Sequence, residues 1–295
     1  MKLPNFIICG TQKGGTSALY YFLKEHPEIY LSPKKEVHYF DLNYQKGLKW
    51  YEKHFKGASS KYKAIGEASP LYMYLEEVPE RIHETLPDAK LIFILRNPVD
   101  RAYSHYWHEI RLGYEWLPFE EAIKKEKERL AAGTIFDKQH YSYLDRGKYI
   151  KQLKRYRKYF SKDQMLILIS EELKNKPENV LKRVFEFLDV NTQFRIESFN
   201  NKNIGKRPRF LIIQRLIVAK LHTLHQYYIP EAYPLTNRLI LLINALNLIP
   251  GYPKMNPQTR KKLSEYFKPY NKKLEDFLGH KLEQWYTKSI ARRSK

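Results

Sequence analysis

A glycine-rich loop decides the fold of this chain: Cys9-Gly-Thr-Gln-Lys-Gly-Gly-Thr-Ser-Ala-Leu19. The residues before it, Phe6 to Cys9, form an apolar run typical of a buried strand. Glycines let the backbone turn so that several N–H groups converge on one anion. A helix that starts at Thr16 adds unpaired N–H donors and the positive end of its dipole. The stretch therefore predicts a phosphate-binding loop between a strand and a helix.

This loop departs from the Walker pattern of ordinary nucleoside triphosphatases. Gly10 and Gly15 have the spacing of that pattern, but Thr16 stands where the pattern has lysine, and the lysine is Lys13. An ordinary NTPase is disfavoured, because its lysine and its magnesium-holding hydroxyl would both be misplaced. Two alternatives stay open on the loop alone: a kinase that uses the same α/β core, and a strand-to-helix turn without a ligand.

The first two thirds of the chain alternate short apolar runs with helical patterns. This alternation predicts an α/β fold with a central parallel sheet flanked by helices. The expected strands are Asn5–Gly10, Ala64–Glu67, Lys90–Arg96 and Met165–Ser170. The expected helices are Thr16–Glu25, Val78–Leu86, Val99–Arg111, Pro118–Ala131, Leu144–Tyr159 and Pro177–Leu188.

A cation follows one of the expected strands. Arg96 comes directly after the apolar run of residues 91–95, and Pro98 is placed to open the helix that carries Ser104. Open α/β sheets bind ligands at the carboxyl ends of their strands. Arg96 is therefore a candidate anion ligand, with a solvated surface charge as the alternative.

Five segments of the chain resemble motifs of one enzyme family. They are the loop at residues 11–19, the segment Leu95–Ser104, and the stretches Lys35–Asp41, Lys46–Tyr51 and Glu67–Tyr72. Their order and spacing are similar to those of sulfotransferases that use 3′-phosphoadenosine 5′-phosphosulfate (PAPS). The nearest branch is that of the heparan sulfate N- and 3-O-sulfotransferases, and the chain resembles a bacterial, cyanobacterial-type member. The resemblance covers roughly residues 5–190 and implies a P-loop-like three-layer fold.

The resemblance implies that the nucleotide is held at both ends. The loop residues that match the 5′-phosphosulfate site are Lys13, Gly14, Gly15, Thr16, Ser17 and Ala18. Arg96 and Ser104 match the pair that binds the 3′-phosphate. Lys13 also matches the cation that stabilises the leaving group, and the expected product is adenosine 3′,5′-bisphosphate (PAP). The family's scheme needs no metal, and we expect none.

The same resemblance assigns catalytic and acceptor roles. Glu36 matches the general base, which takes the proton from an acceptor hydroxyl or amine during in-line attack on sulfur. His38 and Asp41 match positions near the acceptor, and His38 is also a catalytic candidate. Glu67 matches an acidic residue of the acceptor site, but Ala68 replaces the neighbouring lysine that grips an anionic glycan. The expected acceptor is therefore a small molecule, a lipid or a carbohydrate.

The last third is basic and is expected to form a helical C-terminal cap on the same domain. Residues 201–295 contain 19 Lys or Arg and 5 Asp or Glu. The helical patterns are Phe210–His225, Leu235–Leu248 and Gln258–Leu278, with a break or kink at Pro269, and Ser289–Lys295 reads as a frayed tail. Residues 203–209 or 254–260 are candidate cations that cover the nucleotide. Residues 210–248 form a substrate lid, an interfacial membrane contact or a plainly packed helical pair.

Composition excludes several classes of protein. The 295 residues are 43% hydrophobic and 15% aromatic, so a packed core is expected. We expect a single domain, with residues 1–200 as its nucleotide-binding core. The formal net charge of +21 suits anionic ligands, but no nucleic-acid recognition motif accompanies it. A lone buried Cys9, no signal-peptide pattern and no apolar run long enough to cross a bilayer predict a cytoplasmic protein.

Overall fold

A parallel sheet of five strands forms the centre of the first of two compact units in this computed structural model. The structure describes residues 3–196, 199, 205–226 and 242–286. The strand order is β2-β3-β1-β4-β5, and the parallel pairing confirms the expected fold class. The strands are β1 (Phe6–Gly10), β2 (Ile29–Leu31), β3 (Ala64–Ala68), β4 (Lys90–Leu95) and β5 (Met165–Ile169).

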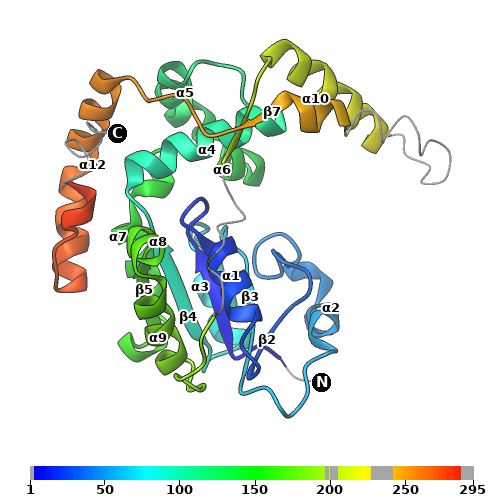
Figure 1. Ribbon diagram of the computed structural model, residues 1–295, viewed down its shortest axis with the longest axis vertical. Coiled ribbons are helices and arrows are strands. Elements are labelled where there is room, and N and C mark those ends of the chain that lie inside the picture. The colour runs from blue at the N-terminus through cyan, green and yellow to red at the C-terminus, as the bar shows by residue number, and fades with distance from the viewer. Residues whose placement is uncertain (1–2, 197–198, 200–204, 227–241, 287–295) are drawn as a thin grey trace. The chain divides into compact units, whose positions relative to one another are not determined.

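Helices cover both faces of this sheet and give it three layers. Because successive side chains of a strand point to opposite faces, β1 supplies Ile7 and Cys9 to one core and Phe6 and Ile8 to the other. The helices that bury the first core are α3 (Val78–Thr85) and α7 (Tyr149–Tyr156), and those on the second are α1 (Thr16–Lys24) and α9 (Pro177–Phe187). Figure 1 shows these helices around the strands.

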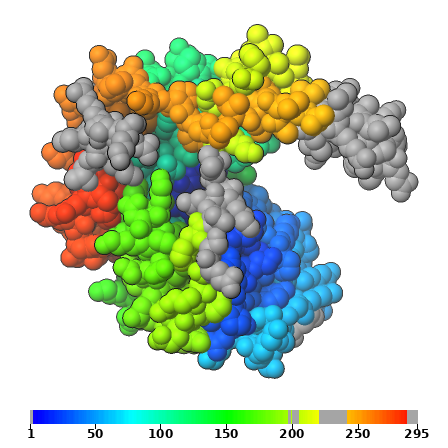
Figure 2. Space-filling view, in the orientation of Figure 1, coloured from blue at the N-terminus to red at the C-terminus, as the bar shows by residue number. Residues whose placement is uncertain are grey.

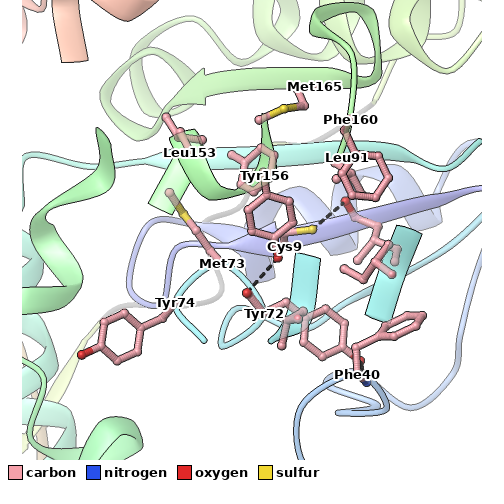
Figure 3. Close-up of a cluster of buried hydrophobic side chains, with 14 of the residues drawn as sticks. Cys9, Phe40, Tyr72, Met73, Tyr74, Leu91, Leu153, Tyr156, Phe160 and Met165 are labelled. Atoms are coloured by element: carbon pink, nitrogen blue, oxygen red, sulfur yellow. Dashed lines mark hydrogen bonds between the residues drawn. The ribbon is translucent and has the colours of Figure 1, made fainter. Parts of the chain in front are cut away.

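The first core also holds the sheet to the segment after β3. Cys9 is fully buried there, as the sequence predicts for a small core residue. Figure 3 shows it among Tyr72, Met73 and Tyr156, and the hydroxyl of Tyr156 donates to the carbonyl of Tyr72 at 2.8 Å. This packing fixes the segment that follows β3 against the end of β1, beside the glycine-rich loop.

The second unit is built from residues 102–145 and 203–264, and the first from the remainder. Residues of α4 (Pro98–Leu112) and α12 (Pro257–Leu278) fall in both units. The second unit contains α5 (Phe119–Ala131), α6 (Ile135–His140), α10 (Leu211–Gln226), a helical turn over residues 242–247, and an antiparallel pair of β6 (Lys206–Pro208) with β7 (Leu248–Pro250). The boundary between the two units does not fall at residue 200, where the sequence predicts the end of the nucleotide-binding core. The single-domain organisation stays a prediction.

Most expected elements are present, with shifts at their ends. The helix expected from Leu144 begins at Tyr149, because η3 (Asp145–Gly147) precedes it. α12 runs through Pro269 without a break. Of the helix expected over Leu235–Leu248, residues 235–241 lie outside the described residues, as does Ser289–Lys295. Within the described ranges, every helix is too short or too polar to span a membrane.

Several short elements were not predicted. Besides β2, α6, β6 and β7, they are α2 (Leu48–Glu52), α8 (Ser170–Asn175), η1 (Tyr44–Lys46), η2 (Lys53–Phe55), η4 (Lys162–Gln164) and η5 (Glu283–Trp285). Each spans three to six residues, too few for a helical or strand period to be recognised in the sequence.

Candidate active site

The glycine-rich loop follows β1 and ends at the start of α1. Gly10 and Gly15 have φ values of 154° and 112°, which L side chains rarely adopt. Gly14 is required for another reason, since a Cβ there would lie 2.4 Å from the carbonyl oxygen of Ile94. Gly15 is the N-cap of α1 and has no side chain to cap the helix, so the N–H groups of the first turn can face an anion. Thr16, Ser17 and Ala18 lie in that first turn.

Arg96 lies against this loop. It follows the last residue of β4, and its Nη1 donates to the carbonyl oxygen of Lys13 at 3.1 Å. Lys13 itself has a φ of 66°, a left-handed backbone conformation within the loop. The backbone of Arg96 is held in turn, because Tyr149 donates its hydroxyl to the Arg96 carbonyl at 2.8 Å. Two predicted ligand residues from segments 83 positions apart in the sequence are thus brought together.

A set of hydrogen bonds fixes the segment after Arg96. The backbone N–H of Asn97 donates to Glu171 at 3.2 Å, and the Asn97 side chain donates to the carbonyl of Trp285 at 2.9 Å. The indole of Trp285 donates to the same Glu171 carboxylate at 3.1 Å. The start of α4 is therefore tied to α8 and to the C-terminal segment of the first unit.

Ser104 is the one predicted nucleotide ligand whose pairing the structure does not address. It is buried on α4, in the part of this helix that belongs to the second unit. Arg96 belongs to the first unit. Their joint contact with one phosphate stays a prediction.

Glu36 lies at the same edge of the sheet, because its backbone is hydrogen-bonded to the end of β3. Its backbone N–H donates to the carbonyl of Ala68 at 3.0 Å, and Ala68 is in register with Ile8 of β1, two residues before Gly10. Neighbouring strands lie about 5 Å apart, so the carboxyl ends of β1, β3 and β4 hold the loop, Glu36 and Arg96 at one edge. This is the edge at which open α/β sheets bind ligands.

The side chain of Glu36 lies in a row of alternating charges. It pairs with Lys35 on one side, and its Oε2 is 3.6 Å from Nε2 of His38 on the other. The other ring nitrogen of His38, Nδ1, is 2.8 Å from Oδ2 of Asp41. The Asp41 side chain is fully buried, while that of Glu36 is 44% exposed. Glu36 is thus the acidic member of the row that a ligand can reach.

The row shifts the pKa values of its members. Burial by itself would raise the pKa of Glu36, but the His38 hydrogen bond and the Lys35 charge outweigh it and lower the pKa from 4.5 to about 2. Burial would lower the pKa of His38, but Asp41 and Glu36 raise it from 6.5 to about 9. At neutral pH the row therefore holds an ionised Glu36 and a protonated His38.

Glu67 lies beneath this row and is fully buried. Its carboxylate accepts hydrogen bonds from the hydroxyls of Tyr51, Tyr72 and Ser69 at 2.8, 2.9 and 2.7 Å. Burial raises its pKa, and these three hydrogen bonds oppose the rise. The Ser69 hydroxyl also accepts the backbone N–H of His38 at 3.2 Å. Glu67 thereby supports the His38 segment from below, and its direct contact with an acceptor stays a prediction.

Sequence reasoning missed a buried arginine next to the loop. Arg146 is 1% exposed, donates to the side-chain oxygen of Gln12 at 2.5 Å, and lies over the ring of Tyr74 at 4.9 Å from its centroid. Its neighbour Gly147 does not set it apart in the sequence, because Lys46 and Lys56 also precede a glycine. Arg146 fixes the Gln12 side chain and adds positive charge beside the glycine-rich loop.

Comparisons with known proteins agree with this geometry. The family model described as the sulfotransferase domain matches residues 3–205. Heparan sulfate glucosamine 3-O-sulfotransferase 5 of Mus musculus is 31% identical over 283 residues, which cover 95% of this chain and 74% of that protein. The membrane-associated sulfotransferase kil1 of Dictyostelium discoideum is 29% identical over 266 residues, covering 64% of this chain and 56% of its own.

A solved structure matches over almost the whole chain. It is a sulfotransferase from Alicyclobacillus acidocaldarius, with 28% sequence identity and a TM-score of 0.72, covering 97% of this chain and 100% of that one. Among the described residues, no group of three or more His, Cys, Asp or Glu side chains is arranged to hold a metal ion.

Proposed function

The chain belongs to the sulfotransferase domain family and is a sulfotransferase, and we propose that it takes the sulfuryl group from PAPS and transfers it to a hydroxyl or amine of a carbohydrate, lipid or small-molecule acceptor. The observation that carries this proposal is one edge of the sheet. It brings the glycine-rich loop, the Arg96 cation and the ionised Glu36 to the ends of three adjacent strands.

Lys13, Gly14, Gly15, Thr16, Ser17 and Ala18 would hold the 5′-phosphosulfate of the nucleotide. The backbone turns of the loop and the first turn of α1 supply N–H donors, and Lys13 supplies charge. Arg96 and Ser104 would hold the 3′-phosphate. The hydrogen bond from Arg96 to the Lys13 carbonyl supports this assignment, because it couples the position of the loop to the end of β4.

Glu36 would act as general base and Lys13 as the leaving-group cation. The oxygen of the acceptor hydroxyl attacks sulfur in line and forms a new S–O bond, and Glu36 accepts the proton of that hydroxyl. The S–O bond to the 5′-phosphate breaks, and its electron pair stays on the phosphate oxygen. Lys13 stabilises that charge, which makes PAP the leaving product. Glu36 is already ionised at neutral pH, as this role requires.

His38 and Asp41 would orient Glu36 and the acceptor. A protonated His38 between two carboxylates fixes the direction of the Glu36 side chain, and Asp41 holds the ring from behind. The mouse relative is named for a heparan sulfate acceptor, which favours a carbohydrate hydroxyl. Ala68, in place of the lysine expected beside Glu67, argues for an acceptor less anionic than heparan sulfate.

A transfer assay tests the proposal. PAPS labelled in its sulfuryl group is incubated with the protein and a panel of neutral sugars, heparan precursors, lipids and phenols. We expect label in at least one acceptor, with Lys13→Ala losing most of this transfer and Lys24→Ala retaining it. Lys24 is an exposed cation at the far end of α1, so it controls for the loss of charge alone. Absence of transfer to every acceptor, or equal transfer by Lys13→Ala, contradicts the proposal.

A further inference from the structure

The second unit exposes an apolar surface on two helical segments. It consists of Phe210, Leu211, Ile212, Ile213 and Leu216 on and before α10, and Leu242, Ile243 and Leu246 on the turn at residues 242–247. Ile212, Leu216 and Leu246 are 75%, 68% and 71% exposed. Figure 2 shows the two segments side by side, α10 in yellow and the turn in orange. We call these eight side chains the apolar face.

Two polar residues of the same segments point inward. Gln214 and Asn247 are 1% and 4% exposed, and the Asn247 amide donates to the Gln214 side chain at 3.1 Å. Asn247 also donates to the carbonyl of Phe210 at 3.1 Å and accepts its N–H at 2.9 Å. Gln214 bonds Asn244 at 3.3 Å. These bonds join the two segments into one surface that buries two amides and exposes apolar side chains, unlike a helix pair that faces water.

The rest of the second unit holds this face in place. The Gln214 amide donates to the carbonyl of Arg111 on α4 at 2.8 Å. Gly113 packs so closely on Val218 that a Cβ at Gly113 would lie 2.4 Å from that side chain. The apolar face is therefore fixed on the unit by contacts on its inner side, and its outward side chains are not needed for that packing.

Exposed cations lie beside the apolar face. In sequence, residues 203–264 contain ten Lys or Arg and one Glu. Lys206, Arg209 and Arg215 are exposed and lie on or next to the segments that form the face. The guanidinium of Arg215 is stacked over Trp116, 4.8 Å from the ring centroid, which adds an amphipathic aromatic ring beside the cations. Apolar side chains flanked by cations match an interface between acyl chains and anionic headgroups.

We propose that the apolar face is a docking surface for an anionic phospholipid bilayer. The eight side chains enter the boundary between headgroups and acyl chains, and the surrounding Lys and Arg contact lipid phosphates. A second copy of this chain is a poorer occupant, since its own copy of the face would carry the same excess of cations. Binding at this surface is independent of the reaction proposed above.

Vesicle sedimentation tests this docking. Phosphatidylcholine vesicles with and without phosphatidylglycerol are incubated with the full chain. We expect binding that needs the anionic lipid and weakens as salt rises. The variant Ile212→Ser/Leu216→Ser/Leu246→Ser should lower the partition coefficient by about tenfold or more, because three apolar side chains leave the lipid. Its matched control, Tyr21→Ser/Leu48→Ser/Ile135→Ser, removes exposed apolar side chains elsewhere and should bind as the wild type does.

A second variant separates the charge from the apolar contact. Lys206→Gln/Arg209→Gln leaves the eight apolar side chains intact and should weaken binding about fivefold per cation on anionic vesicles only. Light scattering with size-exclusion chromatography measures self-association of the same samples. The proposal is overturned if the wild type does not bind anionic vesicles, or if both variants bind as the wild type does. It is also overturned if the wild type forms a dimer in place of vesicle binding and the apolar variant dissociates that dimer.

Discussion

The charges beside Glu36 control its basicity, on which its proposed role as general base depends. A carboxylate with a pKa near 2 is fully ionised at neutral pH but is a weak base by itself. Lys35 and His38 cause this low pKa. An acceptor that displaces Lys35 would raise the basicity of Glu36 at the moment when a proton must be taken. The side chain is exposed enough for such a displacement.

Replacement of Glu36 by glutamine separates catalysis from binding. Glu36→Gln keeps the shape and cannot accept a proton, so turnover should fall by about 10² to 10⁴-fold while affinity for PAP barely changes. Steady-state transfer kinetics and calorimetry measure the two quantities. Glu25→Gln, an exposed acid at the end of α1, is the control and should match the wild type. Wild-type turnover of Glu36→Gln with an alcohol acceptor would move the general base to another residue.

The pKa of the His38 ring should lie near 9, and its neighbour Asp41 should supply part of the rise, with Glu36 supplying the rest. The negative charge of Asp41 stabilises the protonated ring, so Asp41→Asn removes that stabilisation and lowers the pKa of His38 toward 6.5. Proton NMR of the ring resonances checks both values. Asp88→Asn, an exposed acid elsewhere in the first unit, should leave the titration unchanged. A ring that titrates near 6.5 in the wild type contradicts the charge row.

Sequence motifs predicted the candidate catalytic residues, and they missed distant residues that contact the candidate site. Glu36, His38 and Asp41 stand close together in the chain, so a local motif can identify them as a group. Arg146 reaches Gln12 across 134 positions, and Trp285 reaches Asn97 across 188. These contacts depend on how strands and helices pack, and no short spacing in the sequence encodes them.

At the scale of elements, the loop depends on the close approach of β1 and β4. The backbone N–H of Thr11 donates to the carbonyl of Ile94 at 2.9 Å, and Gly14 passes beside the same carbonyl. The end of β4, with Arg96, is therefore coupled to the loop through backbone contacts. A change that separates these two elements should damage nucleotide binding without altering a charged group.

Gly14→Ala makes such a change. Its Cβ would lie 2.4 Å from the Ile94 oxygen and 2.9 Å from the Thr11 oxygen, so the loop must shift, at a cost of about 1 to 3 kcal/mol in unfolding free energy. The same shift of the loop should lower the affinity for PAP. In Gly133→Ala the added Cβ meets nothing within 4 Å, and only the left-handed backbone costs about 1 kcal/mol. Denaturant unfolding and calorimetry test both variants, and unchanged PAP affinity in Gly14→Ala argues against the loop as its site.

Long elements with a clear period were predicted well, and short ones were not. The four expected strands and the six helices of the first two thirds are present within a few residues. β2, with three residues, is recognisable only by its pairing with β3. Pro269 was expected to break or kink a helix, and α12 continues through it over 22 residues, with the backbone hydrogen bond that a proline cannot donate missing at that position.

At the scale of the whole molecule, the two proposals assign positive charge to two different regions. In the proposals above, the cations Lys13, Arg96 and Arg146 would serve a small anion at the sheet edge, and the exposed Lys206, Arg209 and Arg215 would contact lipid phosphates beside the apolar face. The net charge of +21 is consistent with the two anionic partners proposed here, a nucleotide and a lipid surface. A nucleic acid is not needed to explain it.

A calorimetric titration with PAP in the absence of magnesium tests the central claim most directly. We predict binding at about micromolar affinity by the wild type, because several charge-assisted hydrogen bonds hold the two phosphate groups. Lys13→Ala and Arg96→Ala should each weaken it by about tenfold to a hundredfold, Lys24→Ala should not, and ATP should bind poorly. Equal affinity for ATP and PAP, or an affinity for PAP that is unchanged in both Lys13→Ala and Arg96→Ala, would contradict the account of this chain as a PAPS-dependent sulfotransferase.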